Sequence, residues 1–399
     1  MADTMTAATP SRPGFKLQPL PALVMTSVAL LVIGVVMISS ASMDMASATL
    51  GNAYHYVIRQ VIFALLGCIT ALITVNVPIG WWERTSWLLL AVGMLALSLM
   101  LTPMALTVNG STRWLPLGLF NVQVSEIAKV CLVAYMAGYI VRRREELRRK
   151  SWGLVKPMLV LAMATGLLMI QPDFGATVVL VTACMTMIFL SGVCLKRFMV
   201  MVVVLMAVGV GLVFAEPYRL KRMVSYLDPW QDQFNTGYQL TQSLIAFGRG
   251  EWTGVGLGNS IQKLFFLPEA HTDFIFSIIS EEFGLLGALF VLLLFATLVI
   301  SGFVIARRAE KAGMPFGACF SYGITMLFGL QAGINMAVAT GLAPTKGLTL
   351  PLVSYGGSSL LVFCACIGIL ARVEMERLDR EQQPPQAVAG NRRGGAAYE

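Results

Sequence analysis

Residues 273–306 read DFIFSIISEEFGLLGALFVLLLFATLVISGFVIA, and no charged side chain follows Glu282 in this stretch. A helix of about 20 apolar residues crosses a hydrocarbon core about 30 Å thick, so the stretch predicts a transmembrane helix. Similar apolar runs occupy residues 21–43, 57–77, 86–104, 124–141, 157–171, 175–193, 198–215, 273–306, 314–341 and 351–371. The sequence therefore predicts an all-α integral membrane protein of about ten transmembrane helices.

The composition agrees with a membrane protein. Of the 399 residues, 57% are hydrophobic and only 13% are charged, whereas a soluble domain has about 25% charged residues. A net charge of +8 would suggest nucleic-acid binding in a soluble protein. Here the basic residues form short clusters between apolar runs, and the positive-inside rule accounts for them better. We expect membrane lipids as partners and no nucleic acid.

The basic clusters predict the orientation. Arg142–Lys150, Lys196–Arg197 and Arg307–Lys311 follow alternate apolar runs, which places these clusters and both termini on the cytoplasmic side. The expected organisation is a disordered cytoplasmic tail at 1–19, a membrane domain at 20–372 and a second cytoplasmic tail at 373–399.

Most of the elaborate polar sequence then falls on the outer side, in segments at about 105–123, 216–272 and 342–350. The longest, between the seventh and eighth helices, carries Leu240, Leu244 and Phe247 at helical spacing. We expect a folded interfacial structure there and not a flexible tether. Gly254–Gly258 resembles a phosphate-binding loop, but no Rossmann strand precedes it and no Walker lysine follows, so a tight turn is favoured.

Glu269, His271 and Asp273 gather at the outer entrance of the helix quoted above. Asp273 stands where the polar loop gives way to the apolar helix, and partial desolvation suits a carboxylate to act as a general base. A helix N-cap formed by Thr272 or Asp273 explains the same pattern equally well. From position alone, both interpretations stay open.

Other charged residues lie inside apolar runs. Carboxylates within a membrane are costly and often functional, but for Glu281 and Glu282 we favour structural pairing, for example with Lys129 or Arg59. Glu126 and Lys129 are three residues apart and share one helix face. They form either an internal salt bridge or a site at which Lys129 contacts an anionic group of the substrate.

Two further cations are predicted on the outer side. Arg113 lies beside Trp114 in the first outer segment, and Lys346 lies in the third. Such cations can hold a pyrophosphate. Each can equally contact lipid headgroups by snorkelling, and only convergence with a carboxylate would favour the first role.

At these residues the chain resembles the SEDS family, the shape, elongation, division and sporulation proteins of bacteria. The resemblance covers almost the whole chain, and Ala343–Gly347 is more similar to the division branch than to the elongation branch. The matching stretches are Asn109–Gly118, Glu126–Lys129, Gln171–Gly175, Gly254–Gly258, Pro268–Gly287 and Gly341–Ser359.

The resemblance implies a ten-helix fold in the bacterial inner membrane and a peptidoglycan glycosyltransferase that uses lipid II at the division septum. It also implies a partner, the class B penicillin-binding transpeptidase of the divisome, together with other divisome regulators. In the family, the aspartate that matches Asp273 is held to be essential for polymerisation.

The expected chemistry needs no nucleotide, because a lipid-linked disaccharide carries its own pyrophosphate leaving group. Asp273 would activate the acceptor hydroxyl for attack with inversion at the donor's anomeric carbon, releasing undecaprenyl pyrophosphate. Arg113, Lys129 and Lys346 would hold the pyrophosphates, and Glu269 and His271 would also contact the substrate. No cofactor is certain, although one carboxylate is enough to help a substrate-held Mg²⁺ or Mn²⁺. The alternatives are a lipid II flippase and a non-catalytic divisome scaffold.

Overall fold

The computed structural model describes residues 18–382, except residues 104, 109–110, 117–120, 150–151 and 215–223. Nearly all of the predicted N-terminal tail, the last part of the C-terminal tail and the Asn109-Gly110 pair lie outside the described residues.

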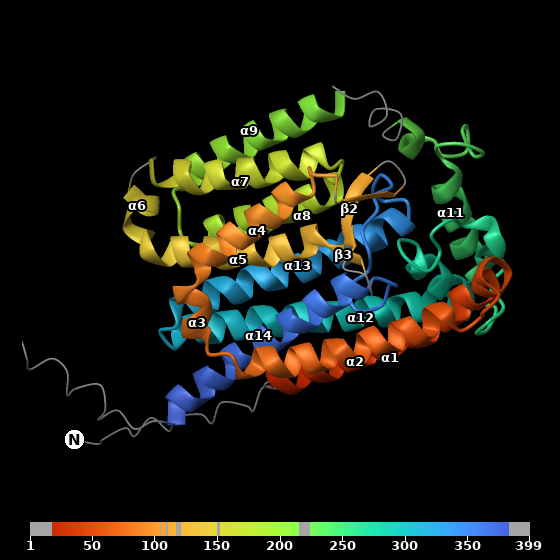
Figure 1. Ribbon diagram of the computed structural model, residues 1–399, viewed down its shortest axis with the longest axis horizontal. Helices are drawn as coiled ribbons and strands as arrows, with labels where there is room; N and C mark the ends of the chain where they lie inside the picture. The colour runs from red at the N-terminus through yellow and green to blue at the C-terminus, as the bar shows by residue number, and fades with distance from the viewer. Residues whose placement is uncertain are drawn as a thin grey trace, which may run out of the picture.

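Each of the ten predicted apolar runs contains a helix, and these helices lie alongside one another in a bundle (Figure 1). Eight of them are long and apolar enough to cross a membrane within the described residues, whereas α4 and α8 are apolar but shorter. The helices are α1 (Pro19–Leu50), α2 (His55–Asn76), α4 (Ser86–Leu99), α5 (Val124–Arg142), α7 (Trp152–Ile170), α8 (Phe174–Leu190), α9 (Leu195–Phe214), α12 (Ile275–Lys311), α13 (Pro315–Ala339) and α14 (Gly357–Gln382). The all-α membrane fold is thus confirmed, and the number of spans stays a prediction.

The centre of the bundle is formed by helices that are mostly buried. α5, α13 and α14 have most of their span buried, and α12 packs between α1 and α13. α9 is the opposite case, because none of its span is buried. It contacts its neighbour α8 near its start, where the Phe198 and Phe189 rings lie 5.0 Å apart.

Three short strands close one end of the bundle, where the sequence predicted only a polar segment. They are β1 (Leu106–Val108), β2 (Ser111–Pro116) and β3 (Asn121–Gln123), antiparallel in the order β1-β2-β3. β3 continues directly into α5, and the Gln123 N–H donates to Ser358 Oγ of α14 at 3.0 Å. We call this end of the bundle the sheet end and the opposite end, which carries α3 (Ile79–Arg84) and α6 (Arg144–Arg149), the basic end.

Residues 342–356 re-enter the bundle from the sheet end without forming a helix. Leu350, Leu352 and Val353 are fully buried. A side chain on Gly34 of α1 would begin 2.8 Å from the Leu352 carbonyl oxygen, so a glycine there permits this close approach. The helix predicted from residue 351 therefore begins only at Gly357, because this non-helical chain occupies its first turns.

The described part of the long segment before α12, from residue 224 onward, is folded, as predicted. It contains α11 (Tyr238–Gly250), which packs against α12, and a short helical turn, η1 (Gln262–Phe266). Leu240 is buried on the inner face of α11, and the neighbouring Ser243 Oγ donates to the Ala339 carbonyl oxygen at 2.6 Å. The segment is therefore tied both to α12 and to the end of α13.

The tight turn predicted at Gly254–Gly258 has a structural purpose. α12 breaks at Gly284, whose φ of 66° and ψ of −165° are not helical. Residues 251–256 bind the peptide groups that this break exposes: the N–H groups of Val255 and Gly256 donate to the carbonyls of residues 281 and 282, and the carbonyls of residues 251 and 252 accept from residues 285 and 286. Such groups would be costly without partners in an apolar environment.

Candidate functional site

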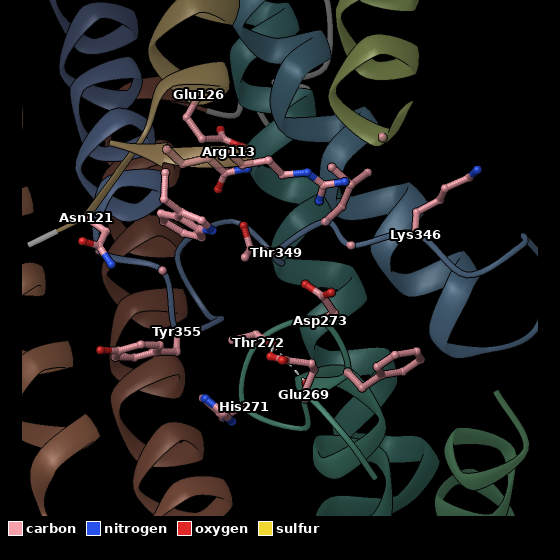
Figure 2. Close-up of a pocket in the computed structure, with 18 of the residues that line it drawn as sticks. Arg113, Asn121, Glu126, Glu269, His271, Thr272, Asp273, Lys346, Thr349 and Tyr355 are labelled. Carbon is pink, nitrogen blue, oxygen red and sulfur yellow. Dashed lines mark hydrogen bonds between the residues drawn. The ribbon is translucent and has the colours of Figure 1, made fainter. Parts of the chain in front are cut away.

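The sheet end contains a pocket of about 1350 Å³. Its wall is built from the start of α2, from β2 and β3, from the α7–α8 turn, from residues 269–274 and from the re-entrant segment. Of the residues predicted to form a site, those that line it are Arg113, Glu126, Glu269, His271, Asp273 and Lys346 (Figure 2). The structure thus brings together predicted side chains from four separate stretches of sequence: β2, α5, the residues before α12 and the re-entrant segment.

Asp273 lies in the pocket wall just before α12. Its backbone is held on both sides, because its N–H donates to the Glu269 carbonyl at 3.1 Å and its carbonyl accepts from Asn335 Nδ2 at 2.8 Å. α12 begins at Ile275 without a side-chain cap, and the Thr272 hydroxyl donates to Glu269. The N-cap position is thus Phe274, one residue after Asp273.

The side chains of Asp273 and Arg113 both lie beside Gly347. A side chain placed on Gly347 would begin 3.2 Å from Asp273 Oδ2 and 3.5 Å from Arg113 Nη1. Asn335 Nδ2 also donates to the Leu348 carbonyl at 2.6 Å, so one amide fixes both the Asp273 and the Gly347 segments. The convergence of a carboxylate with a cation, which the sequence could not establish, is present.

The α7–α8 turn holds both cations of this part of the pocket. Arg113 Nη2 donates to the Pro172 carbonyl at 2.6 Å, and Arg113 Nε lies 3.9 Å from Asp173 Oδ2. Lys346 Nζ lies 4.0 Å from the centre of the Phe174 ring. Figure 2 shows Lys346 pointing away from Asp273, so this cation lies at the side of the pocket and Arg113 nearer its centre.

His271 and Glu269 form another part of the wall. His271 is buried, with its ring 5.0 Å from the ring of Tyr56 and 5.8 Å from that of Tyr355. Burial lowers the pKa of His271, and the carboxylate of Glu269 partly opposes this shift. The imidazole is therefore neutral at pH 7, so it can exchange hydrogen bonds with a ligand but does not add a positive charge.

Lys129 does not line the pocket. Its side chain is only 1% exposed, and Nζ donates to Glu126 Oε1 at 2.9 Å and to Gln331 Oε1 at 2.5 Å. The salt bridge is thus present, and the alternative of a direct contact between Lys129 and the substrate does not fit this geometry. The pocket instead receives Glu126, whose buried Oε2 has no hydrogen-bond partner among the described residues.

Glu281 and Glu282 are buried ion pairs, as favoured, but their predicted partners were wrong. Glu281 Oε1 lies 2.9 Å from Arg249 Nη1 of α11, and Glu282 Oε1 lies 3.3 Å from Lys263 Nζ of η1. The folded segment before α12 supplies both cations, so neither glutamate needs Lys129 or Arg59.

Sequence reasoning missed several pocket residues. Arg59 and Tyr56 of α2 line the pocket, and Tyr355 does so from the re-entrant segment. An arginine near the outer end of an apolar run was a usable signal for Arg59, which we had considered only as a partner for the glutamates. Tyr355 lies within a stretch that resembles the SEDS family, but nothing in its own pattern pointed to a pocket.

No three His, Cys, Asp or Glu side chains of the described ranges gather closely enough to hold a metal ion. Asp273 shares the pocket with the carboxylates of Glu126 and Glu269 and with the cation Arg113.

Comparisons with known proteins agree on one family. The family model for cell cycle proteins of the FtsW, RodA and SpoVE type matches residues 21–379. The chain is 72% identical over 384 residues to the probable peptidoglycan glycosyltransferase FtsW of Marinobacter nauticus, covering 96% of each chain. It is 52% identical to the protein of the same name from Hahella chejuensis, covering 93% of this chain and 94% of the relative.

Solved structures give the same fold. A chain from a peptidoglycan synthase complex that coordinates polymerization and crosslinking superposes with a TM-score of 0.73 at 26% identity, covering 90% of this chain and 98% of that one. The rod shape determining protein RodA of Thermus thermophilus has a TM-score of 0.65 at 24% identity, covering 89% and 96%. From its sequence and its fold alike, the chain belongs to the FtsW/RodA/SpoVE family of cell cycle proteins.

Proposed function

We propose that this peptidoglycan glycosyltransferase polymerises lipid II in the pocket at the sheet end, with Asp273 as its general base. The observation that carries the proposal is that Asp273 Oδ2 and Arg113 Nη1 both lie within 3.5 Å of the position of a side chain on Gly347. A base and a cation are the two groups that a sugar transfer from a lipid pyrophosphate requires.

The reaction forms one bond and breaks one. Asp273 takes the proton of the acceptor's 4-hydroxyl, and that oxygen bonds to the anomeric carbon of the donor. The bond between this carbon and the pyrophosphate oxygen breaks, and undecaprenyl pyrophosphate leaves with the electron pair. Arg113 and Lys346 would stabilise the negative charge that develops on the leaving group. A single displacement inverts the anomeric carbon, so an α-linked donor yields a β-linked glycan.

Other pocket residues would position the two substrates. Glu126, held by Lys129, offers an unsatisfied acceptor for a sugar hydroxyl or an amide N–H. Neutral His271 and exposed Glu269 offer further polar contacts beside Asp273. If a divalent cation takes part, Asp273 is the carboxylate that would contact it, and the pyrophosphate oxygens would supply most of its ligands.

The proposed location is the bacterial inner membrane at the division septum, with the pocket facing the periplasm. The basic residues of α6 and of the α12 C-terminus lie at the opposite end of the bundle, which the positive-inside rule assigns to the cytoplasm. Lipid II would then be used on the side where the wall is built.

The proposed partner is a class B penicillin-binding transpeptidase of the divisome, with divisome regulators around it. One of the two solved relatives described above is a chain of a peptidoglycan synthase complex in which polymerization and crosslinking are coordinated. That relative supports an assembly in which this chain polymerises glycan strands and a separate subunit crosslinks them.

The test is polymerisation of labelled lipid II by the purified protein, alone and with its transpeptidase partner. Wild type should make polymer, Asp273→Asn should make none, and Asp228→Asn should behave as wild type, because Asp228 is exposed and outside the pocket. Partner binding and the thermal midpoint establish that Asp273→Asn is folded. Polymer from Asp273→Asn would overturn the base assignment, and no polymer under any condition would favour a flippase or a scaffold.

A further inference from the structure

We infer that the α7–α8 turn, residues 171–175, is the frame of the pyrophosphate site, with Asp173 and Phe174 as positioning residues. The inference rests on the proposed function, because it concerns the cations that would hold the leaving group. The juxtaposition that carries it is simple: consecutive residues of one turn contact both Arg113 of β2 and Lys346 of the re-entrant segment.

The turn itself is firmly anchored. Gln171 is buried, and its Nε2 donates to the Leu97 carbonyl of α4 at 2.8 Å. Asp173 is 1% exposed and caps α8, because its Oδ1 accepts from the Ala176 N–H at 3.1 Å. A side chain on Gly175 would begin 2.9 Å from Leu348, so the turn also packs against the residue that follows Gly347. A group attached to this turn is therefore fixed relative to the pocket.

The turn sets the direction of the Arg113 guanidinium. The Pro172 carbonyl accepts a hydrogen bond from Arg113 Nη2, and the buried Asp173 Oδ2 lies 3.9 Å from Arg113 Nε. Asp173 Oδ2 has no hydrogen-bond partner among the described residues. Nη1 is thereby directed to the Gly347 side, where Asp273 lies. A guanidinium held along one edge presents its remaining N–H groups to an oxyanion with little loss of conformational entropy.

The turn also sets the place of Lys346. A lysine has four rotatable bonds, and a half-buried one needs a contact to stay in one place. The Phe174 ring supplies that contact, since a cation over an aromatic face is attracted by its quadrupole. The same side of the pocket is lined by the apolar Met169 and Ile170. Lys346 is thus kept where the polar pocket meets apolar side chains, as the junction of a pyrophosphate and a lipid chain requires.

The test measures binding of farnesyl pyrophosphate, with farnesol as the control for lipid contact, to the purified full chain by titration calorimetry. Phe174→Leu should weaken pyrophosphate binding about threefold, the size of an exposed cation–π contact. Phe174→Tyr should restore it, and Phe189→Leu, at the other end of α8, should have no effect. In a Lys346→Gln background, Phe174→Leu should cost nothing more, because its effect passes through Lys346.

Asp173→Asn provides the second arm. Asparagine caps a helix as well as aspartate does, so the fold is kept while the charge beside Arg113 is removed. Asp173→Asn should weaken the binding of farnesyl pyrophosphate, and it should cause no further weakening when Arg113→Gln is also present. That result supports the frame. Unchanged or tighter binding, or additive effects in either double variant, would overturn it. Lipid II polymerisation by the wild-type protein is measured in parallel. If the wild type makes no polymer, the proposed function is overturned. If the wild type is active and Phe174→Leu binds farnesyl pyrophosphate as tightly as wild type, only the frame is overturned.

Discussion

Asp273 and Glu282 are carboxylates at and just inside the same end of α12, yet their surroundings differ in kind. Glu282 is 1% exposed and lies between Lys263 Nζ at 3.3 Å and the Ser40 hydroxyl, which donates at 2.6 Å. Asp273 is half-buried in a pocket wall, with Arg113 across Gly347. A carboxylate enclosed by protein partners stabilises the fold, whereas one that faces a pocket beside a cation is placed for a ligand.

Substitution of Asp273 is expected to have the largest effect on activity. Asp273→Asn should reduce polymerisation by about 10²–10⁴-fold, the usual contribution of a general base. The thermal midpoint should stay near that of wild type, because asparagine fills the same space. Rates with labelled lipid II and melting curves in one detergent test both statements. A variant that melts early and polymerises normally would reverse the roles we assign.

Glu282→Gln should show the opposite pattern. It leaves the buried Lys263 without its counter-charge, and breaking a buried ion pair costs about 3–5 kcal/mol. The thermal midpoint should fall clearly, whereas the protein that stays folded should polymerise lipid II at nearly the wild-type rate. Adding Lys263→Met should recover stability, because it removes the uncompensated charge. If the double variant melts like the single one, the pair is not what holds η1 to α12.

Gly347→Ala tests whether the positions of Asp273 and Arg113 in the pocket matter for activity. The new methyl group would lie between Asp273 Oδ2 and Arg113 Nη1, both within 3.5 Å of its position. Polymerisation should fall about tenfold, since small displacements of catalytic groups are costly. Gly317→Ala, in α13 outside the pocket, is the matched control, because a side chain there meets only ordinary contacts at 3.5 Å or more. Equal activity of the two variants would argue against a shared Asp273–Arg113 site.

The smallest effect concerns His271 and pH. Its pKa is lowered in the folded state from the ordinary value of 6.5, chiefly by burial. The unfolded chain therefore binds the proton more readily, so the contribution to stability is full above pH 6.5 and is lost as the pH falls through the folded pKa. Melting curves between pH 5 and 8 should show a steeper acid loss for wild type than for His271→Gln. Parallel curves would mean that His271 is not the group responsible.

The helices were predictable because apolar length is a local property of the sequence. The regions that were not predicted depend on distant contacts. The strands β1–β3 are short, and the last of them is held to α14 through the hydrogen bond from Gln123 to Ser358. Residues 351–356 are apolar enough to continue a helix, but packing against Gly34 gives them another path.

The site was predicted in part for the same reason. Asp273 could be selected because it lies at the edge of an apolar run, and Arg113 and Lys346 because they are cations in segments predicted on the outer side. The positions of Arg113 and Lys346 depend on the α7–α8 turn, whose Phe174 carries no charge that would mark it in the sequence as a partner of Lys346. The partners of the two glutamates were missed because α11 and η1 bring Arg249 and Lys263 back to α12.

The break of α12 at Gly284 has a consequence for biogenesis. The first part of this helix exposes peptide groups that residues 251–256 must satisfy. These residues are made earlier on the ribosome than the helix they complete. We therefore expect the translocon to release residues 251–256 and the first part of α12 to the lipid together, with the hydrogen bonds between them already formed.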